Sequence, residues 1–437
     1  MTKQNLESIG KFEVNVGGTT RIVPFTLEEY EARKKHLKEI MAREKVDMVY
    51  ITQPDDIFYF TGFDSCWYRA HSGRPWIDMS AGGVACHIDK DDYICYENPA
   101  EEALLWRESI ATDVRIFADD GREMYGKTYH GITKDTNFVD CVVDDLAKSG
   151  WLGCTVGMSL GGHRPSPSVA GKLIAGFEAK GCKVVDMTDP VREVRQIKSP
   201  KEIEYTLKAG EFMNNAVQEL KRKVEPGMTE LQVTAIYEAA LRNAGSENMG
   251  IVNMCRSGIE RLYSFHAPAG RRTIEKGKPF AIDFSGVYNR YHCNNSRVFC
   301  IGEPELPEGH EKEIVECLRK SHNVKELMAK LIKPNMKVEE LMEPVKEYYQ
   351  ELGVWGKQFW TGGYEIGIAY PPDWCGTMVY GPKEFHFNSD EFDDIRFVPG
   401  TVMNFEQGFV SIDTVVFSED DARIIGTSTW DVNIIGA

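Results

Sequence analysis

The stretch that most constrains the fold is residues 280–302, which reads FAIDFSGVYNRYHCNNSRVFCIG. An apolar run leads into Asp283, Ser285-Gly286 interrupts it, and a second apolar run begins at Tyr291. The pattern predicts two strands joined by a glycine-bearing turn. Burying a carboxylate beside an apolar run costs free energy unless the carboxylate is paired or used. Asp283 therefore either holds a turn at the end of a strand or takes part in a functional site.

Three other segments of the chain carry residues that could line one pocket together with Asp283. The run Gly-Gly-Tyr-Glu-Ile-Gly contains Tyr364, the run Asn-Phe-Glu-Gln-Gly contains Glu406, and His266 lies upstream in Ser-Phe-His-Ala-Pro. Together with Asp283 they form four segments that could converge on one site.

Composition limits the classes of partner. The chain has 437 residues, which is long enough for two domains, and its formal net charge is −16. This charge argues against nucleic-acid and anionic-membrane partners, because both need basic patches. The 11 cysteines have no Cys-x-x-Cys spacing, so we expect reduced thiols. The first residues have no apolar signal region and no run is long enough to span a bilayer, so we expect a cytoplasmic protein.

Strands and helices alternate as far as residue 190, which predicts an α/β domain. Helices are expected over 26–45 with Thr26 as N-cap, 139–148 and 166–181, and strands over 46–52, 82–87, 92–96, 153–159 and 183–188. Beyond it, Ser199-Pro200 with Glu202 forms a capping-box pattern that begins a long helix. Further helices are expected over 229–245, 309–332 and 337–352, so the second domain is α+β. We place the domains at 1–194 and 195–437.

An aromatic and arginine-containing loop lies within residues 62–83. It carries Trp67, Tyr68, Arg74 and Trp76. Arginine can hold a carboxylate with two hydrogen bonds, and aromatic faces can hold a cationic head group. The loop is therefore either an irregular surface segment or a binding site for a small zwitterion.

The chain resembles the creatinase/Xaa-Pro aminopeptidase family, the pita-bread fold. The resemblance rests on the segment Arg-Gln-Ile-Lys-Ser-Pro-Lys-Glu at 195–202, on Asp283 with its strand pair, on the 362–367 run and on Glu406. It implies an α/β N-terminal domain and an α+β pita-bread catalytic domain. It also implies a homodimer in which the N-terminal domain of one subunit lies near the site of the other.

The peptidases of this family hold two metal ions with two Asp, one His and two Glu. Asp283 and Glu406 are retained, whereas the second Asp falls at Asn294 and the His at Tyr364. The last Glu falls near Trp430 or Asp431, and Asp413, Glu419, Asp420 and Asp421 compete for this position. A carboxamide and a phenol are poor replacements for these ligands. The resemblance thus implies no metal and no cofactor, as in metal-free members such as creatinase and ectoine hydrolase.

The resemblance also suggests roles. His266 would move protons, Asp283 would be the nucleophile or pair with a cationic nitrogen, Glu406 would orient water or hold a cation, and Tyr364 would donate a hydrogen bond. The expected substrate-binding residues are Trp67, Tyr68, Arg74, Trp76, Asn294 and Lys383.

We therefore expect a metal-independent hydrolase that cleaves an amidine- or amide-type C–N bond, other than a peptide bond, in a small zwitterion. Three alternatives remain open. They are a lyase that eliminates from a sulfonium or ammonium carboxylate, a metal-dependent Xaa-Pro aminopeptidase and a non-catalytic binding module.

Overall fold

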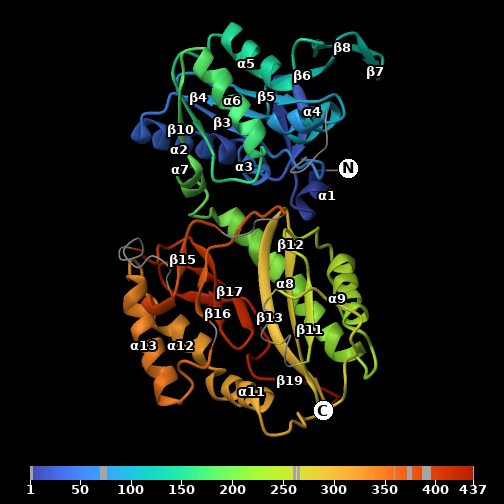
Figure 1. Ribbon diagram of the computed structural model, residues 1–437, viewed down its shortest axis with the longest axis vertical. Coiled ribbons are helices and arrows are strands. Elements are labelled where there is room, and N and C mark those ends of the chain that lie inside the picture. The colour runs from blue at the N-terminus through green and yellow to red at the C-terminus, as the bar shows by residue number, and fades with distance from the viewer. Residues whose placement is uncertain are drawn as a thin grey trace. The chain divides into compact units, whose positions relative to one another are not determined.

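The computed structural model describes residues 3–68, 76–258, 262, 266–358, 360–371, 376–385 and 395–436. The chain divides into two compact units, Met1–Arg195 and Gln196–Ala437, and each is described by itself (Figure 1).

The first unit is an α/β domain, as expected. Its main sheet has eight strands in the order β10-β9-β3-β4-β5-β6-β8-β7, and β1 and β2 form a separate hairpin. The strands are β1 Phe12–Val16, β2 Thr19–Val23, β3 Met48–Ile51, β4 Gly83–His87, β5 Tyr93–Glu97, β6 Asp113–Asp119, β7 Arg122–Met124, β8 Lys127–Ile132, β9 Thr155–Met158 and β10 Lys183–Asp186. The helices are α1 Lys3–Ser8, α2 Leu27–Glu44, α3 Pro54–Thr61, the 3₁₀ helix η1 Trp76–Ala81, α4 Glu102–Glu108, α5 Phe138–Lys148, α6 Pro167–Ala179 and α7 Thr188–Glu193.

Local signals account for most of these elements. The Thr26 hydroxyl caps α2 by accepting a hydrogen bond from the Glu29 N–H at 3.4 Å. Helix α5 begins with a reciprocal capping box between Asn137 and Asp140. The apolar faces of α5 and α6 pack against the sheet and form the core of this unit.

The second unit contains a nine-stranded sheet. Seven strands follow the order β11-β12-β13-β17-β16-β14-β15, while β18 pairs with β17 and β19 pairs with β13. The strands are β11 Met254–Ser257, β12 Pro279–Tyr288, β13 Tyr291–Ile301, β14 Thr361–Tyr364, β15 Val379–Tyr380, β16 Val402–Gln407, β17 Ser411–Phe417, β18 Ala422–Ile424 and β19 Asn433–Ile435. The helices are α8 Pro200–Lys223, α9 Glu230–Ala244, α11 His310–Ser321, α12 Val324–Leu331, α13 Val338–Glu351 and the 3₁₀ helix η2 Lys383–Phe385.

Two helical layers cover this sheet (Figure 1). Helices α8 and α9 share one core with β12, and α11, α12 and α13 share a second core with β16 and β17. The helix expected over 309–332 is divided into α11 and α12, because the chain leaves helical hydrogen bonding between Ser321 and Val324.

The capping box at the start of α8 is confirmed. The Ser199 N–H donates to Glu202 Oε2 at 2.7 Å, and the Glu202 N–H donates to Ser199 Oγ at 3.3 Å. This places the segment 195–202 at the N-terminus of the helix that packs along β12 and β13.

The position of the β12–β13 turn was predicted wrongly. Ser285-Gly286 lies inside β12, and the turn is formed by Asn289 and Arg290, with φ of 45° and 65°. Gly286 is required by packing instead, since a Cβ there would lie 2.2 Å from the carbonyl oxygen of Ala209 in α8. The glycine lets the helix backbone approach the strand.

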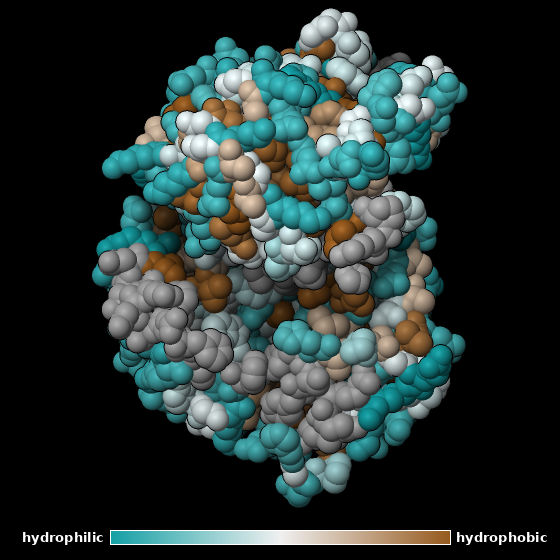
Figure 2. Space-filling model, turned by 45° about the horizontal axis from the view of Figure 1, so that its top comes forward, coloured by the Kyte–Doolittle hydropathy of each residue, from teal (hydrophilic) through white to brown (hydrophobic). Residues whose placement is uncertain are grey.

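Among the residues coloured in Figure 2, hydrophilic side chains predominate between scattered apolar patches, in keeping with the net charge of −16. In the part of the chain that the structure describes, no helix has the length and apolar character needed to cross a membrane.

Candidate active site

The register of five strands brings the two retained acids to one face. Asp283 is paired with Ser296, Ser296 with Ile412, Ile412 with Glu406, and Glu406 with Gly362. Residues opposite one another in an antiparallel sheet project to the same side. Asp283 on β12 and Glu406 on β16 therefore share a face, although they are far apart in the sequence.

Alternation along the strands adds Asn294 and Tyr364 to this face. Each lies two residues from a member of the row, Asn294 from Ser296 and Tyr364 from Gly362. The structure thus brings together four of the residues that the sequence pointed to. We call the side of the sheet that carries them the acid face.

Asn294 is a hydrogen-bond donor to Asp283. Its Nδ2 donates to Asp283 Oδ1 at 3.0 Å and to the carbonyl oxygen of Phe284 at 3.2 Å. Because a carbonyl oxygen can only accept, the N–H end of the amide must point to this side. One oxygen of the Asp283 carboxylate is therefore already satisfied before a ligand arrives.

The acids have different affinities for protons. Burial and the nearby Asp283 carboxylate together raise the pKa of Glu406 to about 8, against the opposing effect of a hydrogen bond from Tyr364. Burial also raises the pKa of Asp283, but the positive charges of Arg256 and His266 and the Asn294 hydrogen bond oppose this rise. Near neutral pH, Glu406 holds a proton and Asp283 is the better candidate for the ionised acid.

Arg256 is a site residue that the sequence analysis missed. Its side chain on β11 is fully buried, at 0% exposure, and lies on the acid face, because Met254, two residues earlier, is paired with Asp283. The available signal was a charged residue in the strand-forming segment Met-Cys-Arg-Ser, since a fully buried arginine is rare.

The sequence analysis also missed Thr414 and Asn404. These two residues hold Asn294 in place by hydrogen bonds. The Asn294 N–H donates to Thr414 Oγ1 at 2.8 Å, and the Thr414 hydroxyl donates to Asn404 Oδ1 at 3.0 Å. Asn404 Nδ2 lies 3.5 Å from Asn294 Oδ1, which completes the ring. All three are buried, so the amide orientation at Asp283 is set by a closed network.

The strand that carries Tyr364 is anchored by the segment that begins α8. Lys198 Nζ forms a buried ion pair with the next residue, Glu365, whose other oxygen accepts from the Thr377 N–H and hydroxyl, both at 3.1 Å. The His292 N–H also donates to the carbonyl oxygen of Gly367 at 3.0 Å.

The remaining predicted residues lie elsewhere or outside the described residues. His266 is exposed, yet its charge reaches Asp283. Lys383 is exposed and pairs with Glu339 at 3.3 Å. Trp67 and Trp76 of the first unit are 58% and 56% exposed, and Tyr68 is partly buried. Arg74 lies outside the described residues.

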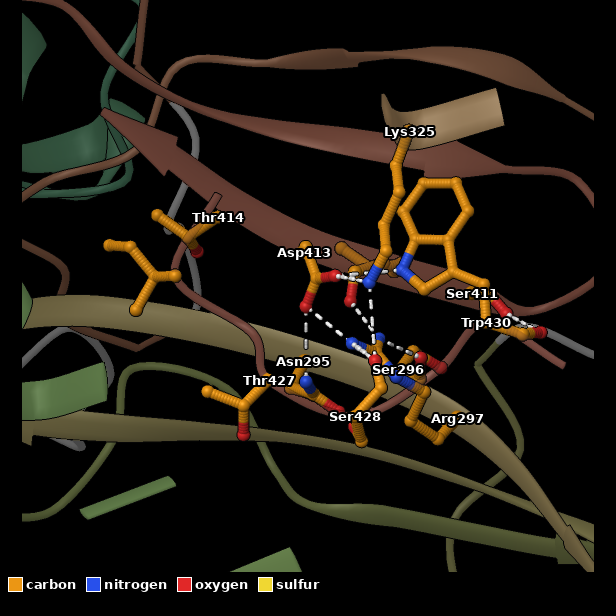
Figure 3. A network of polar contacts seen from close by, with 12 residues as sticks. Asn295, Ser296, Arg297, Lys325, Ser411, Asp413, Thr414, Thr427, Ser428 and Trp430 are labelled. Carbon is orange, nitrogen blue, oxygen red and sulfur yellow. Dashed lines mark hydrogen bonds and ion pairs between the residues drawn. The ribbon is translucent and has the colours of Figure 1, made fainter. Parts of the chain in front are cut away.

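None of Asp413, Trp430 and Asp431 lies on the acid face, and the other candidates for the last family position, Glu419, Asp420 and Asp421, are exposed between β17 and β18. Asp413 projects to the opposite side of β17, where its carboxylate binds Arg297 Nη2 at 2.6 Å, Lys325 Nζ at 3.0 Å and Trp430 Nε1 at 2.8 Å (Figure 3). Asp431 lies near Arg319, with 3.5 Å between Oδ1 and Nε. The residue of β17 that opposes Glu406 on the acid face is Ile412, which has no ligand atom.

These residues do not fit a two-metal centre. The acid face offers two carboxylates, a phenol, an amide that presents its N–H groups, an arginine and an isoleucine. Among the residues that the structure describes, no group of three or more His, Cys, Asp or Glu could hold a metal ion. A dinuclear site needs more anionic or imidazole ligands than this.

Models of known protein families match both units. The model of metallopeptidase family M24 matches residues 204–425, and that of the creatinase/prolidase N-terminal domain matches residues 33–197. The ectoine hydrolase of Halomonas elongata is 25% identical over 413 residues, which cover 88% of this chain and 90% of the relative. The Xaa-Pro dipeptidase of Pyrococcus furiosus is 24% identical over 391 residues, 90% of this chain and 96% of the relative. The crystal structure of X-Pro aminopeptidase from Thermotoga maritima has a TM-score of 0.69 at 19% identity and covers 92% of this chain and 99% of that one, which confirms the expected pita-bread fold.

Proposed function

This chain belongs to metallopeptidase family M24, a family of hydrolases, and we propose that it cleaves an amidine- or amide-type C–N bond in a small zwitterionic compound without a metal ion. The observation that carries the proposal is the acid pair: Asp283 and Glu406 share one face, and an amide donor stands beside them where a metal site would need a ligand. The likeness to an ectoine hydrolase supports a small, non-peptide substrate.

The acid pair supplies both proton transfers of a hydrolysis. Asp283 as carboxylate takes a proton from the water molecule that attacks the electrophilic carbon. Glu406 as neutral acid gives its proton to the nitrogen that leaves, so one water is consumed and a C–O bond replaces the C–N bond. Separate protonation of two neighbouring acids is the usual requirement for such a division of roles.

Other residues of the site orient the reacting groups. Asn294 occupies Asp283 Oδ1 and leaves Oδ2 for the water or for a cationic nitrogen. Tyr364 donates to Glu406 and aligns its carboxyl group. Arg256 adds a positive charge that favours the ionised form of Asp283 and can attract the carboxylate of a zwitterion.

We assign His266 to proton exchange with solvent, since it is exposed and electrostatically coupled to Asp283. We further propose a cytoplasmic homodimer in which Trp67, Tyr68, Arg74 and Trp76 of one subunit, with Lys383, contact the substrate. Sedimentation of the purified protein tests the dimer.

The test is a ligand screen followed by product analysis. Guanidino, cyclic-amidine, betaine and sulfonium compounds are added to the metal-depleted protein, and a ligand at 100 times its Kd should raise the free energy of unfolding by about 2.7 kcal/mol. Each ligand found is then incubated in ¹⁸O-labelled water, and one ¹⁸O in the product together with full activity in EDTA supports the proposal.

Three outcomes would contradict it, and each points to one alternative. An alkene product without ¹⁸O indicates a lyase. Cleavage of Xaa-Pro dipeptides that requires added Mn²⁺ indicates a metallopeptidase. Binding without turnover of any bound compound indicates a non-catalytic module. Asp283→Asn serves as control, because it should abolish turnover while the protein remains folded.

A further inference from the structure

Two cysteines of the first unit lie opposite each other at the start of neighbouring parallel strands. Thr155 of β9 is paired with Lys183 of β10, and the Lys183 N–H donates to the carbonyl oxygen of Cys154 at 3.1 Å. Cys154 and Cys182 are the residues that directly precede this pair. They therefore occupy facing positions across the ladder and project to the same side of the sheet.

The two thiol groups also lie close together. The Gly153 N–H donates to Cys182 Sγ at 3.2 Å, which places this sulfur against the residue next to Cys154. The Cys154 thiol is within hydrogen-bonding range of the Cys182 thiol, and both side chains belong to the same apolar cluster. Both are free thiols in this structure.

This geometry meets the requirements of a disulfide. Neighbouring strands lie about 4.8 Å apart. A disulfide joins residues whose Cα atoms are about 4.4–6.8 Å apart and whose Cβ atoms do not point away from each other. Facing positions on adjacent strands satisfy the Cα separation, and side chains that project to the same side of the sheet do not point apart.

We propose that Cys154 and Cys182 form a dithiol site that reacts with low-molecular-weight disulfides and closes to a reversible intramolecular disulfide. The Cys154 thiolate attacks one sulfur of the reagent and releases a thiolate. Cys182 then attacks Cys154 Sγ in the mixed disulfide and releases the second thiolate. The two cysteines are oxidised by two electrons, the reagent is reduced by two, and the two protons pass to the released thiolates.

Cys154 takes the first step because it is partly exposed, whereas Cys182 is buried. Burial raises the pKa of Cys154 to about 11, and only the thiolate reacts, so the rate should rise about tenfold per pH unit between pH 7 and 9. The closed disulfide would span the loop that contains α6 and would tie β10, the edge strand of the sheet, to β9.

The experiment treats the full-length protein with oxidised glutathione at pH 7, 8 and 9, blocks the remaining thiols by alkylation and analyses tryptic peptides by mass spectrometry. Lys172 and Lys180 separate the two cysteines in the digest. We expect a cross-linked pair of peptides that dithiothreitol separates, and a rate about 100-fold higher at pH 9 than at pH 7.

Variants distinguish the pair from general oxidation. Cys182→Ser should stop at a stable glutathione adduct on residue 154, and Cys154→Ser should give neither product. Cys141→Ser, which removes a partly buried thiol of α5, should behave like the wild type. A lasting glutathione adduct on Cys154 in the wild type, or cross-links of Cys154 to another cysteine at equal yield, would overturn the assignment. Phenylarsine oxide, a reagent for close dithiols, should protect both cysteines from alkylation in the folded wild type, and failure to do so would also count against it.

Discussion

Replacing Glu406 by glutamine should stabilise the protein at neutral and alkaline pH. Glu406 loses its proton more readily in the unfolded chain than in the folded one, because its pKa rises from its ordinary 4.5 to about 8 on folding. The folded state is therefore penalised increasingly as pH rises from 4.5 to 8. Glutamine has the same shape and no charge, so the variant escapes this penalty.

The expected gain in the free energy of unfolding follows from the pKa shift of Glu406. At 1.36 kcal/mol per pKa unit, the full shift corresponds to about 5 kcal/mol above pH 8. Glu406 keeps some contact with solvent, and part of the shift is repulsion shared with Asp283, so we reduce the expected gain to about 2 kcal/mol.

Urea unfolding of the wild type and Glu406→Gln at pH 4.5, 7 and 8.5 measures this gain. The two curves should nearly coincide at pH 4.5 and separate as pH rises, and Glu419→Gln, at an exposed acid, should follow the wild type at every pH. A variant that is less stable than the wild type at pH 8.5, or a difference that is the same at all three values, would refute the reasoning about the acid pair.

Three further predictions concern the support of the site. Asp413→Asn should lower the free energy of unfolding by about 3–5 kcal/mol, because it leaves the buried Arg297 and Lys325 without their carboxylate, whereas Asp421→Asn at an exposed position should change urea stability little. Thr414→Val removes the donor to Asn404 and should cost about 1–3 kcal/mol in the same assay; an unchanged midpoint would show that the network does not constrain Asn294. Burial lowers the pKa of His292 to about 3, so the unfolded imidazole takes up a proton first as pH falls from 6.5 toward 3. Between pH 7 and 5 the wild type should therefore lose about 2 kcal/mol relative to His292→Gln, whereas His322→Gln, at a partly exposed histidine, should follow the wild type.

Features with a local signal were predictable from the sequence. The capping box at Ser199 and Glu202 depends on residues three apart, and the structure has both hydrogen bonds. Asp283 could be singled out because it is a carboxylate beside an apolar run, where burial is costly, whereas Glu406 was indicated by the resemblance to the family. The α/β and α+β character of the two units followed from the order of the periodic segments.

Features that depend on distant pairing were not predictable. Gly286 was read as a turn, because the approach of Ala209 from α8 cannot be seen in the local sequence. Asp413 was a candidate for the site, but a shift of one residue along a strand moves a side chain to the other face, and the register places Ile412 there instead. Thr414 and Asn404 give no signal of their own, because their function arises only when β13, β16 and β17 are side by side.

The short contact between β13 and β17 determines when the site can exist. The ladder between these strands has two residue pairs, Asn295 with Asp413 and Ser296 with Ile412, and the two acids lie in strands on opposite sides of it. Each acid belongs to a hairpin that can form early, but their meeting requires closure of a long intervening chain, which is a slow step in folding. Catalytic activity should therefore appear last during refolding, after the amides of both hairpins are protected from hydrogen exchange. Neither hairpin would be active without the other.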